Sequence, residues 1–193
     1  AGTLYIGTFD GRVYALDTVT GEKRWPEAAQ LGSKSPIIGS PVLDKETVFV
    51  AADDHVYALD RSSGKPRWPK PFEGGGKIWS NVVLVQDTLY FGSLDHNIYA
   101  INRLTGELRW KFLTDGAVTA TPLVANGVLY IGSFDNKFYA IDAASGQPRW
   151  PQPFQAEAWF WARAVEYQGR VYAASLDGKV YALDERSGKP SWS

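Results

Sequence analysis

The sequence predicts an all-β fold of the β-propeller type, built from four-stranded antiparallel blades. A unit of about 42 residues recurs along the 193-residue chain, and it consists of short β-branched and aromatic runs separated by turn residues. Each unit closes on a tryptophan, and these are Trp25, Trp68, Trp110, Trp150 and Trp192. A period of this length with strand-rich content is typical of propeller blades rather than of helical solenoids.

Two apolar runs in each unit flank a tight turn. In the first unit, residues 4–8 and 13–16 lie on either side of Asp10-Gly11. This pattern predicts a hairpin, because the central residues of such a turn need positive φ. Later units carry Asp95-His96-Asn97, Asp135-Asn136 and Asp177-Gly178 there. The turn of the second unit, Asp53-Asp54-His55, is one residue shorter, so we expect its geometry to differ.

A second turn in each unit opens with Asp or Asn and ends with Gly, as in residues 17–21. We expect the acidic or amide side chain to accept amide hydrogens and the glycine to supply positive φ. The outer strand of the blade is predicted to end at the closing tryptophan. An inner strand is predicted before each later unit, over residues 37–43, 78–84, 118–124 and 160–166.

These units predict one repeat array over residues 1–193. Its expected parts are a partial blade at 1–25 and complete blades at 26–68, 69–110, 111–150 and 151–192. The partial blade lacks its inner strand, and nothing after Trp192 supplies one. Two arrangements stay open: part of a larger ring, or a five-bladed ring with one three-stranded member. We favour the partial ring, because closure would leave an exposed edge where the strand is missing.

Composition excludes several classes of function. The net charge of −1 gives no reason to expect a nucleic-acid partner. No apolar run reaches the ~18 residues of a membrane-spanning helix, so we expect no direct membrane insertion in this segment. The absence of cysteine excludes disulfides and thiolate metal sites. Because residue 1 is not Met, we expect a processed or partial product, and a preceding signal peptide or lipid anchor stays open.

The motif Tyr-Ala-Leu/Ile-Asp/Asn, followed by Ser/Thr-Gly and a closing Trp, resembles the tryptophan-docking repeat of the pyrroloquinoline-quinone (PQQ)-like propellers. The resemblance covers essentially the whole chain. It implies that the closing tryptophans pack on the next blade and that their indoles meet the backbone of the repeat turn. The family includes PQQ- and Ca²⁺-dependent quinoprotein dehydrogenases, BamB-like scaffold subunits of outer-membrane assembly, and sensor domains of bacterial kinases.

The residues favour the scaffold over the enzyme. The dehydrogenases of this family cover PQQ with a disulfide between adjacent cysteines and hold Ca²⁺ with Glu, Asn and Asp, whereas this chain has no cysteine and only Asn81 is clearly axial. Glu166 follows an inner strand without a matching acidic partner. We therefore predict a non-catalytic scaffold for protein or ligand binding, with no cofactor, neither PQQ nor Ca²⁺, and with a protein partner or a second copy.

The resemblance alone implies an extracytoplasmic place in a bacterium, at the periplasm, the outer membrane or the cell surface. Two alternatives stay open. One is a fragment of a PQQ-dependent dehydrogenase, and the other is an extracytoplasmic sensor domain of a kinase.

Candidate binding residues come from the inner strands. Trp79 and Trp161 share a position that is Ile38 and Thr119 in other blades. They either fill the space between inner strands or line a face that receives a peptide or small ligand. Polar residues at a neighbouring position, Ser40 among them, are expected to face the axis. The candidates are Trp79, Asn81, Thr121, Trp159, Trp161 and Arg163.

Two other motifs have simpler interpretations. His55 and His96 fall in different hairpin turns, where we expect residues that tolerate left-handed backbone rather than metal ligands. Residues 74–77, Gly-Gly-Gly-Lys, lack the spacing, the hydroxyl residue and the helix of a phosphate loop, so they predict a flexible connection.

Overall fold

The computed structural model describes residues 2–32 and 35–192, which contain nineteen β-strands in five separate antiparallel sheets. None of the described residues belongs to a helix with the length and apolarity that a membrane crossing needs. The sheets form blades 1 to 5 in chain order. Blade 1 has the three strands β1 (Thr3–Gly7), β2 (Arg12–Asp17) and β3 (Ala29–Gln30).

The other four blades have four strands each, ordered from the inner to the outer strand. These are β4 (Val42–Leu43), β5 (Thr47–Ala52), β6 (His55–Asp60) and β7 (Phe72–Glu73); β8 (Val83–Val85), β9 (Thr88–Gly92), β10 (Asn97–Asn102) and β11 (Leu108–Leu113); β12 (Leu123–Ala125), β13 (Val128–Gly132), β14 (Lys137–Asp142) and β15 (Phe154–Gln155); β16 (Val165–Tyr167), β17 (Arg170–Ala174), β18 (Val180–Asp184) and β19 (Pro190–Trp192).

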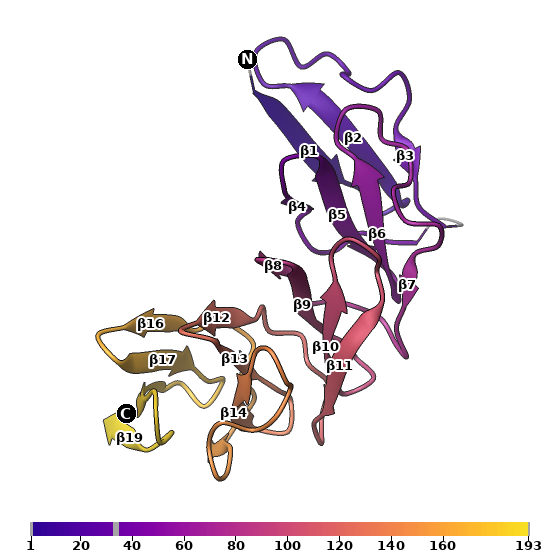
Figure 1. Ribbon diagram of the computed structural model, residues 1–193. Coiled ribbons are helices and arrows are strands. Elements are labelled where there is room, and N and C mark those ends of the chain that lie inside the picture. Colours follow the sequence, from indigo (N-terminus) through magenta and orange to yellow (C-terminus); the bar gives the residue numbers. More distant parts are fainter. Residues whose placement is uncertain (1, 33–34, 193) are drawn as a thin grey trace.

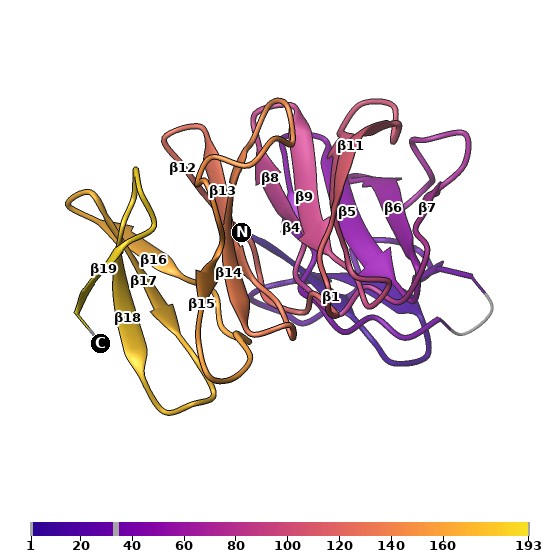
Figure 2. The same ribbon diagram turned by 90° about the horizontal axis from the view of Figure 1, so that it is seen from below.

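The blades form an open arc, which confirms the predicted fold class. Figure 1 shows the inner strands β4, β8, β12 and β16 toward the concave side of the arc, and the two chain ends at opposite extremes. Seen from below, the sheets stand face against face (Figure 2). Four buried apolar clusters lie between successive blades, so each sheet obtains its core from its neighbours. Blades 1 and 5 do not close on each other in this structure.

The inner strands are shorter than the sequence predicts, because their first residues serve as crossings between blades. Ile78 donates its amide to the Asp53 carbonyl of the preceding blade at 2.7 Å, and Val118 donates to Ser93 at 3.0 Å. Backbone groups that bond to the previous blade are not available to their own sheet. The inner strands therefore begin only at Val42, Val83, Leu123 and Val165, and blade 5 adds one isolated bridge between Phe160 and Ser175.

The prediction that outer strands end at the tryptophan is wrong for blades 1 to 4. In blade 3, β11 runs through Trp110 without interruption to Leu113. In blades 1, 2 and 4 a proline follows the tryptophan, as in Trp25-Pro26, and pairing resumes only at β3, β7 or β15. Proline has no amide hydrogen for the ladder, so it breaks the strand at that point.

The first hairpin turn has left-handed residues where they are predicted, with one exception. His96 has φ 70° and Asn136 has φ 67°. The expectation for His55 is wrong, because it begins strand β6 and Asp53 takes the left-handed conformation with φ 54°. The missing residue leaves only Asp53 and Asp54 between paired Ala52 and His55, which moves the turn back along the chain.

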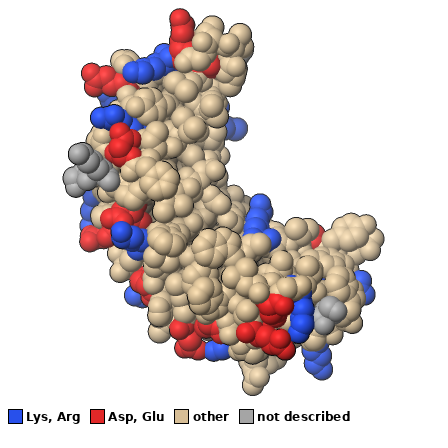
Figure 3. All heavy atoms as spheres, turned by 180° about the vertical axis from the view of Figure 1, so that it is seen from behind, with Lys and Arg blue, Asp and Glu red and all other residues tan. Residues whose placement is uncertain are grey.

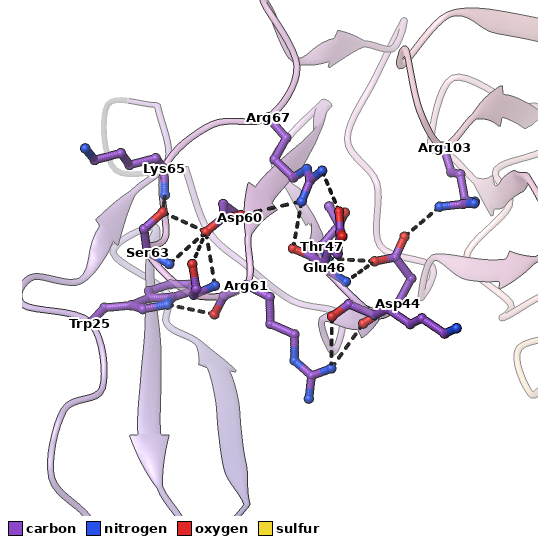
Figure 4. Close-up of polar contacts among 12 residues, drawn as sticks. Trp25, Asp44, Glu46, Thr47, Asp60, Arg61, Ser63, Lys65, Arg67 and Arg103 are labelled. Atoms are coloured by element: carbon purple, nitrogen blue, oxygen red, sulfur yellow. Dashed lines mark hydrogen bonds and ion pairs between the residues drawn. The ribbon is translucent and has the colours of Figure 1, made fainter.

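The closing tryptophan of each of blades 1 to 4 lies on the second turn of the following blade. Nε1 of Trp25 donates to the Arg61 carbonyl oxygen at 3.1 Å (Figure 4). The corresponding bonds run from Trp68 to Arg103, from Trp110 to Ala143 and from Trp150 to Glu185, at 3.1, 3.0 and 3.0 Å. A backbone acceptor is used each time, so the side chain at that position is free to vary.

The glycine of the second turn makes room for the indole. A Cβ atom on Gly64 would lie 2.8 Å from the ring of Trp25, and the backbone there has φ +74°. Gly106, Gly146 and Gly188 face the next three tryptophans at 2.6 to 2.8 Å in the same way. These glycines are needed both for left-handed backbone and for the close approach of the ring.

In blade 2 the leading aspartate of the second turn is stabilised in its ionised form. Hydrogen bonds from the hydroxyl groups of Ser62 and Ser63, helped by their amides, lower the pKa of Asp60 to about 2 (Figure 4). A carboxyl whose pKa is lower in the folded chain stabilises the fold above its unfolded pKa, and it loses that effect as pH falls.

We expect Asp60→Asn to lower the melting temperature at neutral pH and to have a much smaller effect near pH 2, where about half of the wild-type Asp60 carboxyl groups are protonated. The converse variant is Asn102→Asp in blade 3. It should add a pH dependence of the same sign but smaller, because Leu104 stands where Ser62 donates its hydroxyl to Asp60. Thermal unfolding from about pH 6 to about pH 2 measures both. A constant difference between D60N and wild type across this range would contradict the expectation.

Candidate functional site

The predicted axial residues meet at the concave side of the arc. Asn81 joins three blades: its Oδ1 accepts the Ser40 amide at 2.9 Å, and its Nδ2 donates to Thr121 Oγ1 at 2.9 Å. The side chains of Asn81, Thr121 and Arg163 line one open depression of about 510 Å³ together with Ser40. The structure thus brings these sequence candidates together, and ligand binding by them stays a prediction.

Arg163 is the one charged group of this depression. Its side chain is exposed, and it also lines a neighbouring hollow of about 480 Å³ that contains Glu166. The other polar side chains of the depression are those of Asn81, Thr121 and Ser40. The Asn81 amide is held by the Ser40 backbone N–H and by the Thr121 hydroxyl. Such a site can recognise a carboxylate or a backbone carbonyl through Arg163, but it offers no general base.

A second candidate surface consists of three stacked aromatic rings between blades 4 and 5. The ring of Phe134 lies 4.4 Å from Trp159 at an interplanar angle of 12°, and 5.4 Å from Trp161 at 28°. Trp159 is 46% exposed and Trp161 is 52% exposed. We call Phe134, Trp159 and Trp161 the aromatic shelf. Both indoles keep about half of their surface in solvent.

Backbone hydrogen bonds from two blades fix the aromatic shelf. The Phe134 amide donates to the Ala117 carbonyl at 2.9 Å, and the Leu176 amide donates to the Trp159 carbonyl at 2.8 Å. The shelf therefore has rigid strand ends and hairpins on both sides. Rigid aromatic side chains lose little conformational entropy on binding, which makes them effective anchors.

The sequence candidates divide between these surfaces, and one lies outside both. Trp79 is 42% exposed and has no part in the stacked rings. Phe134 is not among the sequence candidates, because its repeat position, after the serine of the first hairpin, falls in a predicted turn. An aromatic residue at this turn position could have indicated a binding surface, because Phe9 occupies the same position in blade 1.

The rest of the described chain contains weaker candidate sites than the axial depression and the aromatic shelf. No three His, Cys, Asp or Glu side chains gather as a metal site within residues 2–32 and 35–192. A hollow of about 740 Å³ lies between blades 1 and 2 and is lined mainly by charged side chains, among them Arg61, Arg67 and Glu46. Arg67 bonds to Glu46 at 2.9 Å there (Figure 4). Figure 3 shows charged side chains along the convex border of the crescent.

Comparison with known families decides the relationship of this chain. The family described as outer membrane protein assembly factor BamB matches residues 1–71 and 52–193. The chain belongs to this BamB family. The family resemblance predicted from the repeat motif is therefore confirmed, and the blades described above are BamB-type blades. No curated protein matches the sequence.

Solved structures show the same fold as this BamB-family chain. BamB from Moraxella catarrhalis superposes with a TM-score of 0.84 at 22% identity, covering 99% of this chain and 60% of that chain. The computationally designed Ika8 protein gives 0.84 at 17%, covering 100% and 58%. The designed Ika4 protein gives 0.68 at 16%, covering 79% and 93%. The chain thus spans less than two thirds of the first two proteins.

Proposed function

We propose that this BamB-family chain is a non-catalytic scaffold that binds a protein partner through its aromatic shelf. The observation that carries the proposal is the pair of half-exposed indoles of Trp159 and Trp161 stacked on Phe134. Tryptophan is enriched among residues that dominate binding energy at protein interfaces. The shelf is uncharged, so an extended peptide segment with apolar or aromatic side chains fits it best.

The axial depression supports binding rather than catalysis. Calcium takes six to eight oxygen ligands, mostly carboxylates and carbonyls. The depression presents Asn81, Thr121, Ser40 and Arg163, with no carboxylate among its lining side chains. A cation beside these groups repels Ca²⁺, so the residues present do not fit the metal of the quinoprotein dehydrogenases.

The proposed place of action is outside the bacterial cytoplasm. It is supported by the family's description as an outer-membrane protein assembly factor. A sensor domain of a kinase is compatible with the same blades, and such a protein would also use them to bind rather than to catalyse.

The shelf is tested by selecting peptides that bind the purified chain from a displayed random library. We expect Trp159→Ala to weaken binding of a selected peptide by about tenfold or more, because loss of a tryptophan anchor has that effect. Its melting temperature should change little, since the ring is 46% exposed. The matched control is Trp79→Ala, another half-exposed indole, which should bind as wild type does.

Three results would overturn the scaffold proposal. One is equal peptide binding by W159A and wild type, and another is failure to select any peptide. The third is a bound chromophore and dye-linked alcohol oxidation after addition of PQQ with Ca²⁺, which would favour the dehydrogenase instead.

A further inference from the structure

The outer strand of blade 3 is longer than the outer strands of the other blades. β11 has six residues, whereas β3, β7 and β15 have two each and β19 has three. In blades 1, 2 and 4 a proline follows the closing tryptophan, and blade 3 has Lys111 at that position. Lysine retains the amide hydrogen that proline lacks, so the outer strand of blade 3 continues past Trp110.

One edge of β11 is unpaired. The strand pairs with β10 and with no other described strand. In an antiparallel pair, alternate residues direct their backbone N–H and C=O groups toward the partner strand. The Thr114 amide donates to the His96 carbonyl at 2.9 Å, so Phe112, two residues earlier, also faces β10. The N–H and C=O groups of Lys111 and Leu113 therefore point away from the sheet.

This edge is accessible on the convex side of the arc. Figure 1 shows β11 on the opposite side of β10 from the inner strands. Leu108 and Leu113, at the two ends of β11, are 47% and 70% exposed. Blades 2 and 4, which lie on either side of blade 3, are both described, and neither places a strand against the edge. The middle of the chain alone therefore determines how accessible the edge is.

Two positive side chains lie along the edge. Arg109 and Lys111 are both exposed, and neither forms an ion pair within residues 2–32 and 35–192. The nearby carboxylate of Glu107 accepts a hydrogen bond from the Thr105 hydroxyl at 3.1 Å. Opposite charges on neighbouring strands stabilise their pairing, so these cations favour a segment that carries carboxylates.

We propose that β11 binds an extended acidic segment of a partner protein, which adds to blade 3 as a fifth strand. Main-chain hydrogen bonds to Lys111 and Leu113 hold the segment, and the charges of Arg109 and Lys111 select its acidic side chains. A second copy of this chain fits the edge less well. Pairing of two β11 strands would place the cations of both copies on adjacent strands, where like charges are destabilising.

The test uses a capped peptide in which Glu and Val alternate, and it follows amide hydrogen exchange of the protein by NMR. In the free protein the amides of Lys111 and Leu113 should exchange rapidly, whereas that of Phe112 is already paired with β10 and should exchange slowly. Saturating peptide should slow exchange at Lys111 and Leu113 by about tenfold or more, because exchange then requires the added strand to leave. The Phe112 amide should change little.

Substitutions at one position separate the backbone contribution from the charge. Lys111→Pro removes an amide hydrogen that the sheet does not use and introduces the proline of blades 1, 2 and 4. We expect it to weaken peptide binding by about tenfold or more. Lys111→Gln retains the amide hydrogen and should weaken binding less. The matched control is Lys65→Gln, which removes an exposed lysine from the second turn of blade 2 and should bind as wild type does.

Several outcomes contradict the proposal. They are unchanged exchange at Lys111 and Leu113 with peptide present, peptide binding by K111P as strong as that of wild type, and equal binding of a peptide with Lys in place of Glu. Protection of these amides without peptide that grows with protein concentration would instead assign the edge to a second copy. Trp159→Ala leaves β11 intact and should bind this peptide as wild type does, so failure of the edge is distinguishable from failure of the aromatic shelf.

Discussion

Trp150→Ala is expected to lower the free energy of unfolding by about 3 to 5 kcal/mol, the usual cost of truncating a buried aromatic residue to alanine. The ring is 2% exposed and packs against Tyr130 and Phe138. Its loss also leaves the Glu185 carbonyl without the indole donor. Urea unfolding followed by circular dichroism measures the change, as a large shift of the midpoint.

The same substitution at Trp192 provides the control. This residue closes the same repeat unit, but its ring is 53% exposed and no described blade follows it. We expect W192A to unfold within about 0.5 kcal/mol of wild type, as is usual for a surface substitution. Equal losses at both positions would show that the tryptophan acts within its own blade rather than on the next one.

Gly132→Ala should also be destabilising, although it adds a single methyl group. A Cβ atom at this strand position would lie 2.0 Å from Cβ of Phe160, which crosses beneath β13 on its way into blade 5. Gly132 does not have positive φ, so crowding alone determines the effect. Overpacking of this kind costs about 1 to 3 kcal/mol, and the backbone of both segments has to move to relieve it.

The control for G132A is Ala174→Val, at the same position of blade 5. Ala174 is exposed, because no described segment crosses beneath β17. We expect this larger residue to change the free energy of unfolding by less than about 0.5 kcal/mol, again measured by urea unfolding. If G132A were as stable as wild type, the crossing segment would have to be mobile enough to move away from the added methyl group.

The repeat and most of its local geometry follow from the sequence alone. The Asp-Gly and Asn turns, the alternating apolar runs and the tryptophan at the end of each unit are local signals, and each predicts backbone conformation within a few residues. The family followed from the same motif. The polar cluster of Asn81 and Thr121 also followed, because equivalent residues of equivalent strands lie at the same height around the axis.

Which of these equivalent residues is buried or exposed depends on how the blades pack against one another. Trp150 and Trp192 have the same place in the repeat and opposite exposures, because burial depends on whether another blade follows. The partnership of Phe134 with Trp159 and Trp161 joins two blades through residues that are far apart in the unit, so no periodicity predicts it. A blade completes its core with a neighbour's side chains, and contacts between blades are therefore not determined by either unit alone.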